Sequence, residues 1–404
     1  MKKNGRREVR HLGVNGDRRA FIQRYVCLSC GVSYTHREHP RSRYTESFKG
    51  DLVRRHVEQR ESYRVQAKRI WEQSGRKIGP TTVNHMVMEI AHQCKSAKQM
   101  SAELRPQWEG YLLADEKMVR VQGGQRWYYH GVDSTGDIPS SRSVSELTST
   151  QAGMFLEEIT GDLSYPLKGI ITDLDSALCT AIERRYPAIP HQICLKHAFT
   201  ALEKAIGYLP YAQQRGWNKS TLRRSFEKLR ETRGIWVEKS RDTFMEAYRA
   251  QKTLAGRHEQ LRTLRDALHT ILFSTTRDLA EKRRKELRRR RLSRSVTAEK
   301  HRALRFLDRY WEKLMTYHAH EGMPRTTNMV ENVNKQIERR MKSLEGFWSG
   351  VNADAYMNLL IAYLRQKPYT DCRGQRKVCN GKSRLACAGV KLGSSDWLQN
   401  AISK

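Results

Sequence analysis

From Trp108 onwards, apolar positions alternate with polar ones or form short runs, as they do in β-strands. Two later segments have apolar residues three and four positions apart, which is the spacing of one helix face. This order predicts an α/β unit that begins with three antiparallel strands. We expect strands at 111–120, 126–133 and about 141–147, a helix at 150–162, a strand at 168–173 and a helix from 175 to about 186.

The segment before this unit has a helical pattern and resembles a helix-turn-helix. Gly75 permits a turn after the first of two helices, and Pro80 opens the second. A helix in this position reads base edges in the major groove, although a packed pair of helices without DNA contact has the same pattern. The side chains expected to reach the bases are Thr82, Asn84 and His85.

A long stretch after the unit, from about 198 to 320, is helical in spacing and strongly basic. Leucines recur at helical intervals between 261 and 272, and a basic run follows at 282–291. We expect this region to be an all-helical insertion that splits the α/β unit, because it is far longer than a single connection requires. The side chains expected to follow a DNA backbone are Arg288, Arg289, Arg290 and Arg291.

The overall charge points to a polyanionic partner. The chain has 75 Lys and Arg against 43 Asp and Glu, a formal net charge of +32. Nucleic acid is the simplest partner for such a charge. There is no apolar run of about 20 residues and the N-terminus is polar, so we expect no membrane segment and an intracellular protein.

Three acidic residues stand in different local sequences. Asp115 closes the apolar run 110–114, Asp173 closes 168–172, and Glu331 lies in a helical segment. Two carboxylates at strand ends and one on a helix can converge on hard cations, which prefer oxygen ligands. Two Mg²⁺ ions, or Mn²⁺, about 3.5–4 Å apart would then catalyse phosphoryl transfer.

Each of these residues also has a structural interpretation. Asp115 fits a strand-end turn, with Glu116 as the more important neighbour. Asp175 competes with the second site and fits the cap of the following helix. Asn328 and Glu331 have the spacing of a capping box, in which the glutamate would bond to backbone instead of metal.

Of eight cysteines, only Cys27 and Cys30 form a Cys-x-x-Cys pair. The pair is typical of one knuckle of a zinc ribbon, and Zn²⁺ would need two further ligands. No cysteine precedes it, so we expect a ribbon whose first knuckle is missing or degenerate. His36 and His39 could complete the site, and two thiols without metal remain the alternative.

Taken together, these motifs resemble the DDE transposases of the Mutator-like superfamily, which includes a bacterial insertion-sequence group. The resemblance covers about residues 108–365 and rests on the order of the motifs more than on any one of them. The matching residues are Asp115, Thr172-Asp173, Cys194-Leu-Lys-His197 and Thr327-Asn328-Met-Val-Glu331, followed by the basic Arg339, Arg340 and Lys342.

The resemblance implies a ribonuclease H-like catalytic fold with Asp115, Asp173 and Glu331 as metal ligands. Cys194, His197 and Asn328 would be auxiliary, and Arg339, Arg340 and Lys342 would contact DNA. The implied partners are transposon terminal inverted repeats and target DNA, bound by a homodimer or higher oligomer. The implied location is the cytoplasm of a bacterial or archaeal host, in association with the nucleoid.

The expected organisation therefore combines DNA-binding segments with a split α/β catalytic domain. Two other functions stay open, a domesticated DNA-binding protein without catalysis and a ribonuclease H-like nuclease that cuts without joining. The expected units are a zinc-ribbon-like segment (1–45), a helix-turn-helix region (46–100), the catalytic domain (108–200 and 321–366), the helical insertion (201–320) and a basic C-terminal tail (367–404).

Overall fold

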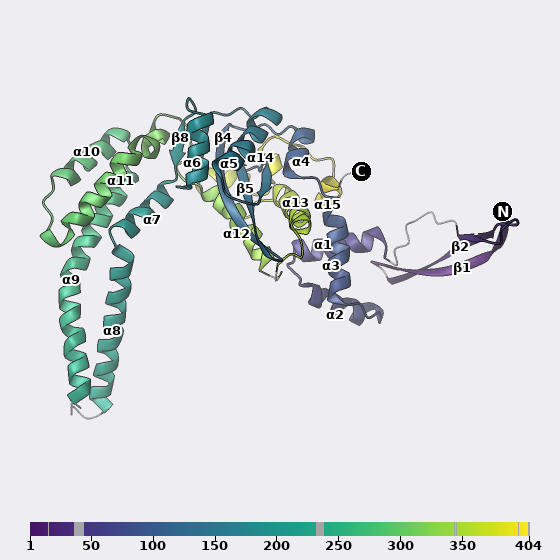
Figure 1. The fold of residues 1–404 in the computed structure, drawn as a ribbon, viewed down its shortest axis with the longest axis horizontal. Coiled ribbons are helices and arrows are strands. Elements are labelled where there is room, and N and C mark those ends of the chain that lie inside the picture. Colours follow the sequence, from purple (N-terminus) through teal and green to yellow (C-terminus); the bar gives the residue numbers. More distant parts are fainter. Residues whose placement is uncertain are drawn as a thin grey trace.

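The computed structural model describes residues 1–14, 16–35, 44–231, 238–342, 344, 346–394 and 396–402. A five-stranded mixed sheet lies at the centre, with helices around it and a separate three-stranded sheet near the N-terminus (Figure 1). The expected α/β class is therefore confirmed. Among the described helices, none combines the length and the apolar character needed to cross a membrane.

The central sheet has the strand order β6-β5-β4-β7-β8. The first three strands along the chain pair antiparallel, whereas β7 and β8 run parallel to β4. Four of the five strands agree with the apolar pattern, and β8 was not predicted. The strands are β4 (Tyr111–Val121), β5 (Gly124–Asp133), β6 (Ser141–Val144), β7 (Gly169–Thr172) and β8 (His191–Ile193).

Helices cover both faces of this sheet because successive residues of a strand point to opposite sides. Leu112 packs among the buried residues of α5 and α6, and Leu113 packs among those of α12 and α13. The helices of the first face are α5 (Ser149–Glu157), continued by a π-helical turn at Glu158–Asp162, and α6 (Ser176–Arg185). Those of the second are α12 (Asn328–Met341) and α13 (Gly350–Gln366).

Four N-terminal helices share the core of α12 and α13. The expected pair with its turn is present, since Gly75 ends α2 at φ 67° and Pro80 is the first residue of α3. Glycine suits this position because a left-handed backbone strains residues with a Cβ atom. The helices are α1 (Glu46–Val57), α2 (Tyr63–Ser74), α3 (Pro80–Ala91) and α4 (Ala97–Leu104).

The described residues between β8 and α12 contain helices and no strands, as the apolar spacing predicts. Leu261, Leu264, Leu268 and Leu272 of α9 are buried against α7, α10 and α11. The outer parts of α8 and α9 form a hairpin that extends away from the sheet (Figure 1). The helices are α7 (Leu195–Ala205), α8 (Tyr208–Glu231), α9 (Glu238–Leu272), α10 (Arg277–Arg289) and α11 (Thr297–Met315), with 3₁₀ turns at Arg294–Val296 and Thr316–His318.

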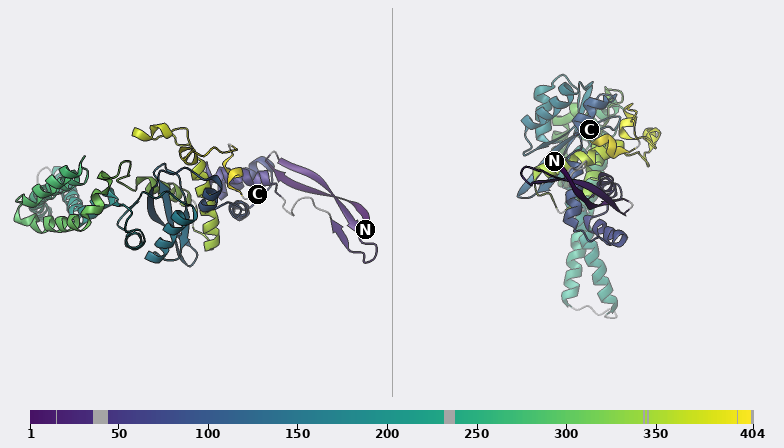
Figure 2. Two further views of the ribbon diagram at one scale, coloured as in Figure 1. Left: turned by 90° about the horizontal axis from the view of Figure 1, so that it is seen from above. Right: turned by 90° about the vertical axis from the view of Figure 1, so that its right-hand side faces the viewer.

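The N-terminal sheet projects from the opposite end of the molecule (Figure 2). Its strands are β1 (Lys2–Gly13), β2 (Gly16–Val26) and β3 (Ser33–Thr35), paired antiparallel in that order. Cys27 and Cys30 lie in the tight turn between β2 and β3, where Gly31 N–H donates to the Cys27 carbonyl at 3.0 Å. His36 and His39 lie outside the described residues.

The segment after α13, expected as a basic tail, packs back onto the body. Trp397, Leu398 and Ala401 are buried, and Lys95 N–H donates to the Ala401 carbonyl at 2.9 Å. This packing corrects the expectation of a tail, because apolar residues late in the chain complete the core of α13. The elements are a 3₁₀ helix (Gly374–Cys379), α14 (Arg384–Cys387) and α15 (Trp397–Ala401).

Candidate functional site

Two of the predicted acidic residues meet where β7 ends beside β4, although Asp115 lies inside β4 and not at a strand end as expected. Asp115 lies in β4, and Asp173 directly follows the neighbouring parallel strand β7. The register pairs Leu113 with Ile171, so both aspartates lie two residues further along their chains. Asp115, Glu116 and Asp173 each offer a carboxylate oxygen, and these atoms lie within 4.8 Å of one another. We call these three residues the acidic group.

Backbone and amide donors hold the acidic group in place. Asp115 accepts from the N–H of Glu116 at 3.0 Å and from the side-chain amide of Asn334 at 2.9 Å. Asp173 accepts from the N–H of Asp175 at 2.8 Å. Helix α12, which carries Asn334, therefore contributes directly to the position of a carboxylate on β4.

The carboxylates of the acidic group disfavour one another's charge. Burial, followed by the charge of Asp173, raises the pKa of Asp115 to about 6 and the pKa of Glu116 to about 8. Burial also raises the pKa of Asp173. Buried carboxylates this close together are destabilised as anions unless a cation joins them.

Glu331 belongs to an adjoining group. One ligand atom each from Cys194, His197 and Glu331 lies within 4.8 Å of the others, and we call these residues the mixed group. Glu331 is paired with Lys196, whose Nζ lies 2.6 Å from Oε2. Burial raises the pKa of Glu331. Lys196, followed by His197, lowers the pKa by more than burial raises it, so the net shift is downward.

The charge of His197, a member of the mixed group, also affects the acidic group. Its positive charge lowers the pKa of Asp115, Asp173 and Glu331 alike, against the larger effect of burial on each. Asn334, one turn after Glu331 on α12, contacts Asp115. The two groups thus adjoin across the first turns of α12, and a metal pair shared by all three predicted carboxylates stays a prediction.

Cys194 and His197 form a hydrogen-bonded pair at the start of α7. Burial raises the pKa of the Cys194 thiol, but hydrogen bonds with His197 and Thr327 outweigh it and the net shift is downward. The hydrogen bond with Cys194 is the largest cause that raises the pKa of His197, to about 9. Each side chain of the pair therefore favours the charged form of the other.

Of the alternative structural roles, the helix cap at Asp175 is confirmed and the capping box of Asn328 and Glu331 is wrong. Asp175 caps α6, with Leu178 N–H donating to its carboxylate at 2.8 Å, as its context predicts. Helix α12 begins at Asn328 with Thr327 as the preceding cap residue, and no capping box forms. Instead, the Thr327 hydroxyl donates to Glu331 Oε1 at 3.3 Å.

Asp133, the last residue of β5, is a buried structural carboxylate. It accepts backbone N–H bonds from Gly110 at 3.1 Å and Thr135 at 2.8 Å. The phenol of Tyr165 donates to it at 2.5 Å. By accepting these hydrogen bonds, the Asp133 carboxylate fixes the end of β5 and the turn that follows.

The residues expected to read bases lie on α3. His85 is exposed there, and Thr82 and Asn84 are half-buried. Asn84 also lines a groove of about 430 Å³ between α3 and the segment before α13. Trp348 lines the same groove and is 75% exposed. This part of α3 is thus accessible, and its contact with DNA stays a prediction.

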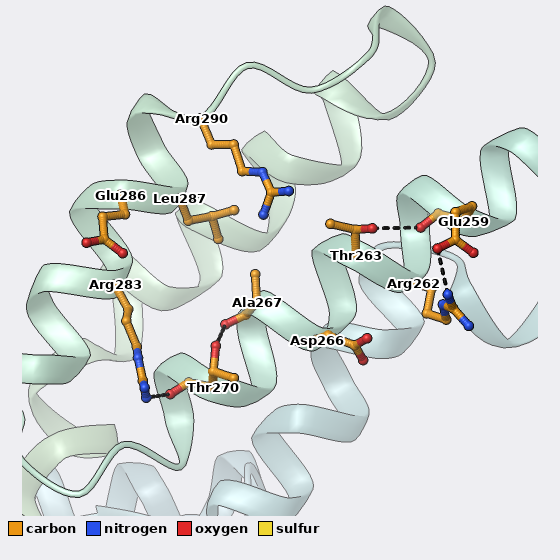
Figure 3. Close-up of a pocket in the computed structure, with 10 residues that line it drawn as sticks. All are labelled: Glu259, Arg262, Thr263, Asp266, Ala267, Thr270, Arg283, Glu286, Leu287 and Arg290. Carbon is orange, nitrogen blue, oxygen red and sulfur yellow. Dashed lines mark hydrogen bonds and ion pairs between the residues drawn. The ribbon is translucent and has the colours of Figure 1, made fainter.

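The arginine run at the end of α10 is partly neutralised. Arg288 donates to both carboxylate oxygens of Asp308, at 2.7 and 2.8 Å. Arg290 lines an open hollow of about 680 Å³ between α9 and α10, where acidic and basic side chains alternate (Figure 3). Arg289 and Arg291 are exposed at the end of the helix.

The basic residues after Glu331 divide between surface and core. Arg339 and Lys342 are exposed. Arg340 is 3% exposed, and its guanidinium donates to the Val57 carbonyl at 3.0 Å and stacks on Tyr363. The expected DNA contact of Arg340 is therefore wrong for this structure, because the side chain joins α12 to α1 and α13.

Two residues of the site were missed from the sequence. Asn334 is three residues after Glu331, so the helical repeat places it close to the same face, and this spacing was a usable signal. Lys196 lies inside the Cys194-Leu-Lys-His197 motif, but its pairing with Glu331 depends on how α7 meets α12. Glu116 was considered only as an alternative to Asp115, whereas the structure groups the two.

Comparison of the sequence with models of known protein families finds no match. A search of curated proteins likewise finds no significant match.

Proposed function

We propose that this protein is a DDE-type DNA transposase, which cleaves phosphodiesters at transposon ends and joins the freed 3′ ends to target DNA. The observation that carries the proposal is the acidic group. Asp115, Glu116 and Asp173 come from neighbouring parallel strands and lie close together. The hydrogen bonds that position the two aspartates come from backbone N–H groups and the Asn334 amide, which are uncharged. In a protein of net charge +32, a phosphodiester is the fitting substrate.

The acidic group fits Mg²⁺ or Mn²⁺ by its donor set. All three ligands are carboxylates, the type that these hard cations prefer. Among the described residues, no hydrogen-bond partner lies beside the buried Oε2 of Glu116 or the buried Oδ1 of Asn334. Bound divalent ions would activate the attacking oxygen and stabilise the leaving oxygen of the phosphodiester. The unpaired oxygens and the mutual repulsion of the carboxylates both favour such a cation.

The side chains around the acidic group have distinct tasks in this proposal. Asn334 orients Asp115, and the N–H of Asp175 orients Asp173. Glu331 approaches from α12 as the third carboxylate of the resemblance, and Lys196 holds its second oxygen. Preorganised ligands of this kind reduce the reorganisation needed when a phosphodiester binds.

The sheet supports the ribonuclease H-like interpretation of the catalytic domain. Three antiparallel strands are followed by a helix, a strand and a helix, which is the order on which that interpretation rests. The parallel pairing of β4 with β7 brings the two aspartates together, as a catalytic role requires. For the N-terminal segment we retain the zinc-ribbon proposal, with Cys27 and Cys30 as two ligands of Zn²⁺.

Binding to transposon ends would combine base contacts from α3 with phosphate contacts from exposed basic residues. Arg289, Arg291, Arg339 and Lys342 are exposed and suited to phosphate. Because strand transfer acts on paired ends, we propose a homodimer or higher oligomer on DNA, associated with the nucleoid.

The test separates chemistry from binding. Asp173→Asn and Glu331→Gln should abolish Mg²⁺-dependent nicking and joining of an end-containing duplex, while a gel shift with the same duplex stays nearly unchanged. The matched control is Glu146→Gln, which changes an exposed carboxylate in the loop before α5. This variant should retain nicking, joining and DNA binding.

The same assays decide between the proposal and its alternatives. Wild-type protein that binds ends but never cuts them, in Mg²⁺ or Mn²⁺, would establish the domesticated DNA-binding protein. Cutting without any joined product would favour the ribonuclease H-like nuclease.

A further inference from the structure

The mixed group brings three different donor atoms together. Cys194 precedes the first residue of α7, His197 lies in the first turn of α7, and Glu331 lies in the first turn of α12. A sulfur, a ring nitrogen and a carboxylate oxygen from these residues all lie within 4.8 Å of one another. The starts of α7 and α12 therefore converge on a donor set unlike that of the acidic group.

One buried residue touches all three of these side chains. Thr327 is 0% exposed, and its N–H donates to Cys194 Sγ at 3.3 Å. Its hydroxyl donates to Glu331 Oε1 at 3.3 Å and lies 3.3 Å from His197 Nδ1. Residues that orient metal ligands through hydrogen bonds are a regular part of metal sites.

The chemistry of the donors selects the ion. Thiolate and imidazole bind zinc and other borderline or soft ions, whereas Mg²⁺ prefers oxygen alone. We propose that Cys194, His197 and Glu331 bind one Zn²⁺ ion, with a fourth position left for water or another ligand. This site goes beyond the proposed transposase activity but shares Glu331 with it, so bound Zn²⁺ and catalytic Mg²⁺ would use this carboxylate in turn.

The surroundings leave a route for the ion and one carboxylate oxygen of Glu331 that Lys196 does not hold. Cys194 is buried, but the side chains of His197 and Glu331 are 36% and 13% exposed, so an ion can enter from their side. Lys196 occupies Oε2 of Glu331, whereas Oε1 faces His197 Nδ1 at 3.9 Å. Zn²⁺ can therefore reach Oε1 without displacing Lys196.

The test uses Co²⁺ as a coloured substitute for Zn²⁺. The full chain carries Cys27→Ser and Cys30→Ser, which removes the N-terminal thiol pair, and excess Mg²⁺ fills the all-oxygen site. We expect a near-ultraviolet thiolate-to-cobalt absorption band that Zn²⁺ abolishes by displacement. Cys194→Ser should remove this band, whereas Cys94→Ser, a buried thiol outside the group, should retain it. Asp115→Asn should also retain it.

Two further variants keep the test decisive if Cys194→Ser fails to fold. His197→Gln, at a partly exposed position, should abolish the band. Thr327→Val keeps the backbone N–H and the side-chain volume but loses the hydroxyl, so Zn²⁺ affinity should fall about 10–100-fold in competition with a chromophoric chelator. A band that survives Cys194→Ser or His197→Gln, or folded parent protein without any band, would overturn the proposal.

Discussion

The end of β7 beside β4, which we call the sheet edge, and the helical region beyond it use charge in opposite ways. At the sheet edge, Asp115, Glu116 and Asp173 are close together, and burial raises the pKa of each. In the helical region, exposed charged side chains form ion pairs at the surface, such as Arg288 with Asp308 and Arg277 with Glu312. Buried like charges that repel one another favour an added cation. Exposed paired charges leave less free positive charge for phosphate than the composition suggests.

The largest expected effect sharpens this comparison at the sheet edge. Asp173→Asn should lower the rate of Mg²⁺-dependent DNA nicking about 10³-fold or more, because the amide removes a metal-binding charge at nearly the same volume. Single-turnover nicking of an end-containing duplex measures the change. Glu146→Gln serves as the control, and a variant within about tenfold of wild type would remove Asp173 from the site.

The second prediction compares a buried ion pair with an exposed one. Arg365 and Asp137 are both 0% exposed and form a bidentate pair at 2.7 and 2.8 Å. Arg365→Leu leaves Asp137 buried without its cation and should lower the free energy of unfolding by about 3–5 kcal/mol. Arg288→Gln, in the exposed pair with Asp308, should lower it by less than about 1 kcal/mol.

Denaturant unfolding followed by circular dichroism measures both changes. Equal losses from Arg365→Leu and Arg288→Gln would contradict the distinction between buried and exposed charge. Far-ultraviolet spectra of the two variants before unfolding control for a change of fold.

The third prediction tests whether exposed arginines of the helical region bind DNA phosphates. Arg289→Gln with Arg291→Gln should weaken binding to all DNA sequences, because exposed arginines contact phosphate without reading bases. The slope of log affinity against log salt should become shallower by about 1–2. Arg288→Gln is the matched control and should have a smaller effect, since Asp308 already neutralises this guanidinium. Loss restricted to particular ends would instead indicate base reading.

The smallest expected effect returns to the sheet edge. The pKa of Glu116 is raised from 4.5 to about 8, mainly by burial, so the protein loses stability as pH rises from the lower value to the higher. Glu116→Gln removes this loss and should raise the free energy of unfolding by about 0.5–2 kcal/mol at neutral pH without metal. The gain should grow between about pH 5 and pH 8, when measured in a chelator against Glu146→Gln. A gain that does not change with pH would argue against a buried Glu116 carboxyl.

Regular elements could be predicted where one face of a strand or helix is buried. The strand that contains Asp115, the strand before Asp173 and the leucine-rich part of α9 all have clear apolar spacing. Strand β8 has only three residues, too few for a period, and its position depends on parallel pairing with β7. The N-terminal hairpin was also missed as regular structure, because most side chains of β1 are exposed and give no alternation.

The candidate site shows the same limit. The order of acidic motifs predicted which residues to examine, but the partners Asn334 and Lys196 follow from how α12 meets β4 and α7. The predicted DNA contact of Arg340 was wrong, although its position in the helical repeat indicates a buried side chain. It continues the buried positions Val330, Val333 and Ile337 along one face of α12, so its charge had to be accommodated inside the protein.

The α8–α9 hairpin sets a length scale for the molecule. Helix α9 has 35 residues, which at 1.5 Å per residue is about 50 Å. Duplex DNA of the same length contains about 15 base pairs at 3.4 Å each. The outer ends of α8 and α9 lie well away from the central sheet (Figure 1), and α9 alone is as long as about one and a half turns of a double helix. Any duplex or second subunit that touches both the sheet and these outer ends would therefore be held at two well-separated points, with its orientation fixed as well as its position.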